Sequence, residues 1–315
     1  MAVLGLGLLG GSTALAARQR GVVSEVLGYA RRRGPLEGAL DAGVIDGFGT
    51  LPEVVGEADL VVLGTPVDAM PTVLKDAAPH LRPGTIVTDV GSVKESLAST
   101  LPPTLPEGVH FVGSHPMAGS HVVGVEHADP DLFVGRSVVV TPTGAADEPI
   151  VERLSCFWEA LGAVVTKRSP AAHDQQVAWV SHLPHLIAYG FAHAFQRAPE
   201  AARALTGTGF QDFTRIARSD PEMWAGILLS NRKSLKGPLQ DFRTSLAAIA
   251  DAVEDGDAEA IVRLLTSAQD TLTGSEVPSA SPPVSGSAQF GGIKPENQAA
   301  STGDARRLEE PNESS

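Results

Sequence analysis

The chain has 315 residues, with 24 Lys and Arg against 37 Asp and Glu, nine His and one Cys. At about 150 residues per domain, this length predicts two domains with a sizeable core. The net charge of −13 argues against a nucleic-acid binder, which would carry a basic patch. The lone Cys156 excludes an internal disulfide, and no apolar run is long enough to span a membrane. We therefore expect a cytoplasmic protein without nucleic-acid or membrane partners.

Short apolar strands alternate with helical stretches over residues 1–168. Strands are expected at Ala2–Leu4, Val23–Gly28, Leu60–Gly64, Thr85–Asp89, His110–Gly113, Ser137–Thr141 and Ala163–Thr166, with a helix at Ile150–Leu161. Ala14-Leu15-Ala16 is similar to a signal cleavage site, but no Lys or Arg precedes the apolar start, so we expect no signal peptide. Apolar strands that alternate with helices predict an α/β domain with a Rossmann-type parallel sheet.

A glycine-rich loop follows the first strand and precedes a helix expected over Ser12–Arg20. In the G-x-G-x-x-G pattern, the glycines allow a tight turn, backbone approach to a pyrophosphate and close helix packing, while the helix N-terminus faces the anion. We expect a dinucleotide site here; the alternative is a glycine-rich turn without a ligand. Its residues are Gly5, Leu6, Gly7, Leu8, Leu9 and Gly10, and we add Thr65 and Pro66, which follow the strand Leu60–Gly64.

The residues after the second strand bear on the choice of cofactor. An NAD site usually places Asp or Glu near position 30 to bond the ribose 2′-hydroxyl. This sequence has Ala30, followed by Arg31, Arg32 and Arg33, which are suited to a 2′-phosphate. The pattern favours NADP, with NAD as the alternative. The alternative is that these arginines form a solvated basic turn that binds no ligand.

A helical domain is expected over residues 169–273. Ser169 and Pro170 are typical of a helix start, and we expect this first helix to reach Phe195 with a bend at Pro184. Further helices are expected at Pro221–Ser234, Leu239–Val253 and Ala258–Leu272. Broad apolar faces predict a homodimer. Residues 274–315, rich in Ser, Pro and Gly, are expected to form a disordered tail.

Four polar segments are expected to meet in a cleft between the two domains. They are Asp89–Lys94, Gly113–Ser120, His173-Asp174 with Ser181–His185, and Gly209–Arg215 with Asp220–Trp224. Each residue alone has a structural alternative, as a helix cap or as part of the core. His182 and His185 with Asp174 would also suit a metal ion. A catalytic metal needs an open coordination position as well, and we expect no metal site here.

These segments together resemble the prephenate dehydrogenases of tyrosine biosynthesis, a family that includes arogenate and cyclohexadienyl dehydrogenases. The resemblance runs from residue 1 to about 273, and its specific parts are His-Pro-Met-Ala-Gly at 115–119 and Ser-His-Leu-Pro-His at 181–185. It implies oxidative decarboxylation of prephenate to 4-hydroxyphenylpyruvate with reduction of NAD(P)⁺. Arogenate, alone or as a second substrate, is the alternative, and feedback inhibition by tyrosine is compatible with the pattern.

The resemblance also implies roles for individual residues. His115 matches the catalytic histidine, and Ser92 matches the serine that orients it. Arg215 matches the arginine that binds the ring carboxylate, where a planar fork fits. The remaining substrate-side residues are His182 and His185, which shape the pocket, Asp212 and Trp224, which hold the arginine and wall the pocket, the cleft pair His173 and Asp174, and Ser114.

One departure from the family pattern, one retained residue and two other functions bear on the interpretation. Many prephenate-type members carry Glu where this sequence has His121, whereas retention of His185 favours prephenate over arogenate. A β-hydroxyacid or imine reductase is a second possibility. The hydroxyacid enzymes share a catalytic lysine on the interdomain helix, and the corresponding stretch Pro170–Phe195 contains no Lys, which argues against this possibility. A non-catalytic NAD(P)-sensing protein would not need His115 and Arg215 in one cleft.

Overall fold

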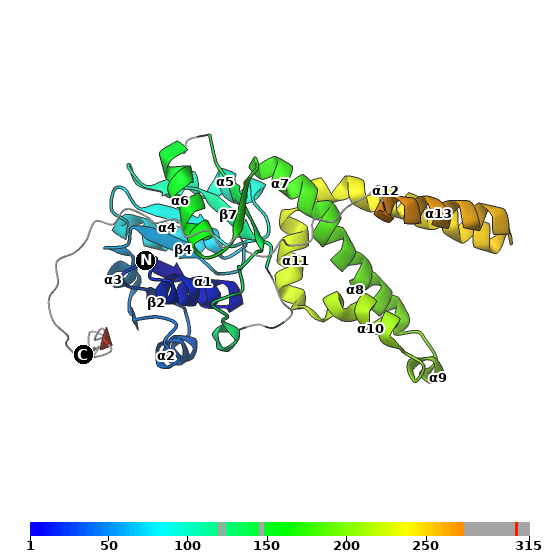
Figure 1. Ribbon diagram of the computed structural model, residues 1–315, viewed down its shortest axis with the longest axis horizontal. Helices are drawn as coiled ribbons and strands as arrows, with labels where there is room; N and C mark the ends of the chain where they lie inside the picture. Colours follow the sequence, from blue (N-terminus) through cyan, green and yellow to red (C-terminus); the bar gives the residue numbers. More distant parts are fainter. Residues whose placement is uncertain (119–121, 123, 145–147, 274–305, 308–315) are drawn as a thin grey trace.

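The computed structural model describes residues 1–118, 122, 124–144, 148–273 and 306–307. An α/β domain is followed by a helical domain with two projecting arms (Figure 1). This arrangement confirms the predicted fold class. No helix among the described residues is long and apolar enough to cross a membrane.

Six parallel strands of the α/β domain lie in the order β3-β2-β1-β4-β5-β6. They are β1 (Ala2–Leu4), β2 (Leu27–Tyr29), β3 (Gly47–Phe48), β4 (Leu60–Leu63), β5 (Ile86–Asp89) and β6 (His110–Phe111). The order reverses between β1 and β4, and dinucleotides bind at such a switch point. The sequence analysis missed β3 because two residues are too few to show a pattern. Beyond β3, the two residues of β10 (Arg306–Arg307) add a parallel pair; the rest of the predicted tail lies outside the described residues.

Alternate residues of the central strands are buried on opposite faces of the sheet. Ala2 and Leu4 of β1 pack in one core, whereas Val3 packs in the other. The helices that cover the sheet are α1 (Leu8–Gln19), α2 (Arg33–Asp41), α3 (Leu51–Val55), α4 (Met70–Ala77) and α5 (Glu95–Thr100), whereas α6 (Glu148–Ala160) packs on the second sheet described below. A sheet covered on both faces explains why these strands are apolar throughout.

A second sheet contains β7 (Gly113–Pro116), β8 (Ser137–Thr141) and β9 (Val164–Lys167). β7 is antiparallel to β8, which is parallel to β9. The strand expected at His110–Gly113 is therefore two strands in two sheets, and His115 lies within a strand rather than in a loop after one. The change of sheet occurs at Gly113, where a Cβ would lie 2.5 Å from the hydroxyl of Thr141.

The first helix of the helical domain contains a π-helical turn. Ser169 caps α7 (Pro170–Val177) by accepting the Ala172 N–H, as predicted. The π turn covers Ala178–His182, and α8 (Leu183–Phe195) follows it. We expected a bend at Pro184. The irregularity lies one turn before it, at the carbonyl groups that would accept a helical hydrogen bond from residue 184 if proline had an N–H.

The remaining helices complete the domain and its arms. They are α9 (Glu200–Arg203), α10 (Thr208–Thr214), a 3-10 turn (Arg215–Arg218), α11 (Pro221–Ser230), α12 (Arg232–Glu254) and α13 (Ala258–Thr273). The predicted boundaries at Ser234 and Leu239 are wrong, because the break falls at Asn231 and α12 continues through Pro238. Leu235 and Pro238 are both buried, and their packing offsets the helical hydrogen bond that the proline removes. In Figure 1, α12 and α13 form one arm, and α8 to α10 form the other.

Candidate functional site

The glycine loop forms the tight turn between β1 and α1. Gly5 has φ +105°, and a Cβ there would lie 2.6 Å from the Thr65 nitrogen. A Cβ on Gly10 would collide with the Gly5 carbonyl oxygen. In contrast, nothing lies within 4 Å of a Cβ on Gly7, which begins α1 with neither a side-chain cap nor an acidic residue in the first turn. The first N–H groups of α1 are thus free of side-chain caps at an open backbone, as a pyrophosphate requires.

Thr65 adds a polar group beside this loop. Its hydroxyl is buried and has no hydrogen-bond partner among the described residues. Leu6 is buried in the core behind the loop, whereas Leu8 and Leu9 form the start of α1. The open glycine backbone, the helix N-terminus and the orphaned hydroxyl therefore fit a nicotinamide dinucleotide, which carries both phosphates and ribose hydroxyls.

The arginines after β2 lie on the surface. Arg31 and Arg32 are exposed, and neither makes a hydrogen bond or ion pair within the part of the chain that the structure describes. Arg33 differs, because its guanidinium pairs with Glu37 at 2.9 Å and lies 5.8 Å from the centre of the Phe48 ring. Two arginines beside Ala30 are thus available for a ligand, and the predicted preference for NADP stays a prediction.

A buried ion pair lies beside β7. Asp89 and Lys94 are at most 1% exposed and contact each other directly, and Lys94 Nζ donates to the Ser114 carbonyl oxygen at 2.9 Å. Burial raises the pKa of Asp89 and lowers that of Lys94, and the attraction between the two charges opposes both shifts. The Ser114 hydroxyl donates to the Asp89 carbonyl oxygen at 2.6 Å. Ser114 is therefore fully buried and supports β7 from within the core.

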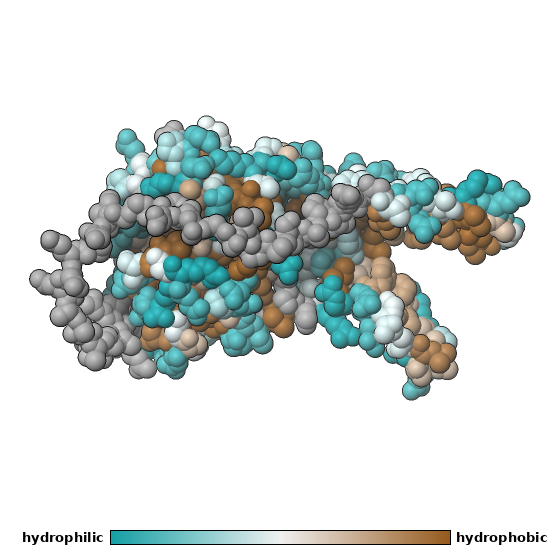
Figure 2. All heavy atoms as spheres, viewed as in Figure 1, coloured by the Kyte–Doolittle hydropathy of each residue, from teal (hydrophilic) through white to brown (hydrophobic). Residues whose placement is uncertain are grey.

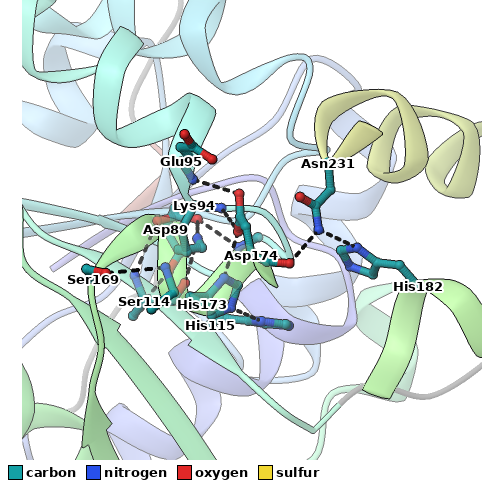
Figure 3. A network of polar contacts seen from close by, with 12 residues as sticks. Asp89, Lys94, Glu95, Ser114, His115, Ser169, His173, Asp174, His182 and Asn231 are labelled. Carbon is teal, nitrogen blue, oxygen red and sulfur yellow. Dashed lines mark hydrogen bonds and ion pairs between the residues drawn. The ribbon is translucent and has the colours of Figure 1, made fainter. Parts of the chain in front are cut away.

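Figure 3 shows a chain of hydrogen bonds behind His115. His115 Nδ1 lies 2.8 Å from His173 Nε2, and His173 Nδ1 lies 2.8 Å from Asp174 Oδ1. The Asp174 carboxylate also accepts the Lys94 N–H at 2.8 Å and the Glu95 N–H at 2.9 Å, at the start of α5. His173 and Asp174, expected to contact substrate, instead lie behind His115 and join the two domains.

The chain of bonds fixes the position of each proton. A carboxylate only accepts, so His173 Nδ1–H donates to Asp174, and a ring that carries this one proton accepts at Nε2. His115 Nδ1–H is then the donor to His173, which leaves His115 Nε2 unprotonated. Burial lowers the pKa of His115 well below 6.5, and the neighbouring His173, Lys94 and His182 act in the same direction. His115 is therefore a neutral acceptor at neutral pH.

Ser92 does not hold His115. It makes no hydrogen bond within the described residues, and His173 takes the orienting position that the sequence analysis gave to Ser92. The residue beside it, Val93, packs against Trp224 of α11. This contact places the helical domain directly on the Asp89–Lys94 segment.

Two of the residues predicted on the substrate side, His182 and His185, lie close to Trp224. The His185 ring stacks on Trp224 with centroids 3.7 Å apart, and His185 Nδ1 donates to the Ser181 carbonyl oxygen at 2.8 Å. Burial and the nearby charge of Arg215 lower the pKa of His185, opposed by that hydrogen bond. Arg215 itself is exposed at the start of the 3-10 turn. Asp212 is exposed too, and no ion pair joins it to Arg215 within the described chain.

His182 lies deeper than His185 and is held by a residue that the sequence analysis missed. Asn231 Nδ2 lies 2.9 Å from His182 Nδ1 and 2.9 Å from the Asp174 carbonyl oxygen. Burial lowers the pKa of His182 to about 4, and its Nε2 has no partner among the described residues. Asn231 gave no signal, because the sequence placed it inside an expected helix.

The alternative of a metal site is not supported. Among the described residues, no group of three or more His, Cys, Asp or Glu side chains could hold a metal ion. Asp174 bonds to His173 and to the start of α5, and His182 Nδ1 faces Asn231. His121, which bears on substrate choice, lies outside the described residues, as do Gly119 and Ser120.

Comparisons with known proteins find matches to both domains. Residues 13–167 match the family described as "Prephenate dehydrogenase, nucleotide-binding domain", and residues 169–267 match "Prephenate dehydrogenase, dimerization domain". The chain is 34% identical over 276 residues to the prephenate dehydrogenase of Bacillus subtilis (strain 168), covering 86% of this chain and 74% of that protein. It is 33% identical over 264 residues to the cyclohexadienyl dehydrogenase of Zymomonas mobilis, covering 82% and 90%.

Solved structures show the same similarity. A prephenate dehydrogenase from Aquifex aeolicus, in complex with hydroxyphenyl propionate and NAD⁺, superposes with a TM-score of 0.80. The identity is 32%, and the match covers 87% of this chain and 96% of that one. Both domains described above are therefore included in the likeness.

Proposed function

Since the chain belongs to the prephenate dehydrogenase family, we propose that it oxidatively decarboxylates prephenate to 4-hydroxyphenylpyruvate with reduction of a nicotinamide dinucleotide, as a step of tyrosine biosynthesis. The observation that carries this proposal is the hydrogen-bonded chain from Asp174 through His173 to His115, which leaves an unprotonated ring nitrogen beside the helical domain. Arogenate is the second candidate substrate, because the relative from Zymomonas mobilis is a cyclohexadienyl dehydrogenase.

His115 acts on the ring hydroxyl of the substrate. During the reaction a hydride leaves the carbon that bears this hydroxyl, carbon dioxide leaves the opposite ring carbon, and the ring becomes aromatic. A nicotinamide dinucleotide held at the glycine loop Gly5–Gly10 would supply the hydride acceptor. His115 Nε2 accepts the hydroxyl hydrogen bond and takes the proton as a carbonyl develops, and the proton returns when the oxygen becomes phenolic. No proton is gained or lost overall, so one neutral imidazole suffices.

The carboxylates of the substrate need cations and donors. Arg215 presents a guanidinium fork, which binds a carboxylate through two parallel hydrogen bonds. His185, stacked on Trp224, and the buried His182 line the region between Arg215 and His115. We assign the ring carboxylate to Arg215, in keeping with the family resemblance.

We assign NADP as the favoured cofactor and NAD as the alternative. Ala30 offers no carboxylate to a ribose 2′-hydroxyl, whereas the exposed Arg31 and Arg32 offer positive charge to a 2′-phosphate. The Aquifex aeolicus relative binds NAD⁺, so the two nucleotides need direct comparison.

The two arms of the helical domain support a homodimer. Figure 2 shows apolar residues along the arm formed by α12 and α13. The exposed apolar residues of the two arms are Phe191, Leu205, Phe213, Leu246, Val253, Val262, Leu265 and Leu272. Apolar faces of this extent are typical of interfaces. We also expect tyrosine, which resembles the product, to compete at the site as a feedback inhibitor, and we expect the enzyme in the cytoplasm.

One assay tests the reaction. The purified protein with prephenate and NADP⁺ or NAD⁺ should produce the reduced nucleotide and an equal amount of carbon dioxide. Parallel reactions with arogenate identify the preferred substrate. Absence of turnover with both substrates and both nucleotides would contradict the proposal.

A further inference from the structure

The partners of the site imidazoles determine which ring nitrogen carries the proton. His185 Nδ1 faces the Ser181 carbonyl oxygen, which can only accept, so Nδ1 is protonated. His115 Nδ1 donates to His173 for the reason given above. When neutral, both rings therefore present an unprotonated Nε2.

His182 is held the opposite way round. The Asp174 carbonyl oxygen accepts only, so the Asn231 amide must turn its NH₂ group towards it. The same Nδ2 lies 2.9 Å from His182 Nδ1 and donates its second hydrogen there. Nδ1 of His182 is thus an acceptor without a proton, and the neutral ring carries its proton on Nε2. Flipping the amide would place two oxygens against each other at the Asp174 carbonyl.

The position of Asn231 in the chain supports a role in the site rather than in the helix. Asn231 is the residue that precedes α12, and asparagine at this position commonly caps the helix with its side chain. Here the side chain makes no capping bond; it is buried, at 2% exposed, and points to Asp174 and His182 (Figure 3). The amide thereby joins α12 to α7 and to the π turn that carries His182.

The Nε2–H of His182 lacks an acceptor. His182 is 0% exposed, and its Nε2 has no hydrogen-bond partner among the described residues. A buried donor without an acceptor destabilises a fold unless a ligand or an ordered water supplies one. The His182 ring lies edge-to-face with Trp224, with the two ring centroids 6.0 Å apart.

We propose that Asn231 is a positioning residue that holds His182 as a neutral Nε2–H donor, giving the site one fixed donor for a substrate oxygen beside two acceptor imidazoles. The ligand group that this donor would bind is an oxygen that only accepts hydrogen bonds, as in a carboxylate or a keto group. Only the identification of the ligand as prephenate rests on the proposed function. Prephenate carries both kinds of group.

The surroundings of His182 keep this donor neutral. The charged and titratable groups that face it are Asp174 and His173 of α7, His185 of α8 and His115 of β7. The Asp174 carboxylate favours a protonated ring, whereas burial and the neighbouring imidazoles oppose it. The N–H of Asn231 blocks the addition of a second proton at Nδ1, because two donors would then face each other.

The tautomer can be measured directly in the unliganded wild-type protein. Long-range ¹H–¹⁵N correlation spectra of histidine-labelled protein, with His182 assigned by the loss of its signals in His182→Gln, should show a protonated Nε2 and an unprotonated Nδ1 from about pH 5.5 to 8.5. A protonated Nδ1, or an imidazolium in this range, would overturn the proposal. The result does not depend on turnover, so it stands even if prephenate is not the substrate.

Variants of Asn231 connect the tautomer with binding. Asn231→Ala should allow both tautomers in the spectra and raise KM for prephenate about tenfold with a smaller change in kcat, as expected for a lost hydrogen bond to a charged group. In Asn231→Asp, the new carboxylate should favour a proton on Nδ1 of His182. At low pH the ring then carries protons on both nitrogens and still donates from Nε2, so KM should rise with pH as the ring loses its positive charge. Ser155→Ala removes an equally buried hydrogen bond in α6, of 2.9 Å, and should leave KM unchanged. Unchanged spectra and KM in Asn231→Ala would refute the role of Asn231.

Discussion

The environment of His115 contrasts with that of Arg215, although both are assigned to one substrate. His115 is 8% exposed and bonded through His173 to a buried carboxylate, and a second buried pair, Asp89 and Lys94, lies beneath it. Arg215 is exposed on a short 3-10 turn, and Asp212 makes no ion pair with it in the described structure. Proton transfer needs a fixed tautomer in a dry setting, whereas capture of an anion needs a hydrated cation that the ligand can reach.

The largest effect should come from the buried side of this contrast. His115→Asn should lower kcat by about 10²- to 10⁴-fold, because the acceptor of the hydroxyl proton is lost, and should leave nucleotide binding unchanged. Steady-state kinetics with prephenate and fluorescence titration with the nucleotide measure the two quantities. Equal kcat values for the variant and the wild type would remove His115 from its assigned role.

Removal of one partner of the buried ion pair should act on stability. Lys94→Met leaves the Asp89 carboxylate buried without its counter-charge, which typically costs about 3–5 kcal/mol in free energy of unfolding. Urea denaturation of the two proteins measures the difference. The control is Lys167→Met, which removes a surface pair with Glu148 and Glu152 and should change stability little. Similar losses in the two variants would show that burial of the pair is unimportant.

The buried imidazoles should make stability depend on pH. The pKa of His182 is lowered to about 4, so the folded chain keeps this ring neutral while the unfolded chain takes up a proton below about pH 6.5. The free energy of unfolding should therefore fall as the pH decreases from about 6.5 to about 4. Urea denaturation at several pH values should show a smaller decrease in His182→Asn. Replacement of the exposed His80 by Asn should retain the full decrease, and loss of it there would contradict the assignment.

The exposed side of the contrast should act through binding. Arg215→Ala should raise KM for prephenate by about 10- to 100-fold, since one charge-assisted contact is lost, while the pKa seen in kcat stays the same. Arg218 is exposed in the same 3-10 turn and provides the matched control. If Arg218→Ala has the same effect as Arg215→Ala, then general positive charge rather than a specific fork attracts the substrate.

The smallest expected effect concerns the cofactor. Arg31→Ala should weaken NADP binding about 5- to 10-fold and leave NAD binding unaltered, because only NADP carries the 2′-phosphate. Titrations with both nucleotides measure the preference, and Arg153→Ala in α6 controls for net charge. An unchanged ratio of the two affinities would rule out Arg31 as the determinant.

The parts of the site that sequence could predict are those whose chemistry lies within one short segment. Gly5–Gly10 reports a backbone requirement that only glycine meets, and the collisions expected for a Cβ at Gly5 and Gly10 explain why. His115 and Ser181–His185 could be singled out as candidates because their motifs are contiguous. The two-domain architecture followed from the alternation of apolar strands and helices up to Ser169.

The parts that sequence could not predict depend on pairing across the chain. His115 and His173 are 58 residues apart, and only the docking of α7 on α5 brings them together. Ser92 was predicted to orient His115, but no local pattern distinguishes a serine that bonds a histidine from one that does not. Asn231 was missed because Pro238 suggested a helix break several residues too late.

The π turn at Ala178–His182 sets the rotational phase of the helix that follows. In an α-helix each residue advances the chain by about 100°, so deletion of one residue from this turn would rotate α8 by about that angle relative to α7. His185 would leave the face of Trp224, and Phe191 would leave the apolar arm. The orientations of His185 and of the apolar face of α8 thus both depend on the one extra residue in the π turn. A relative that lacks it must realign both through changes elsewhere.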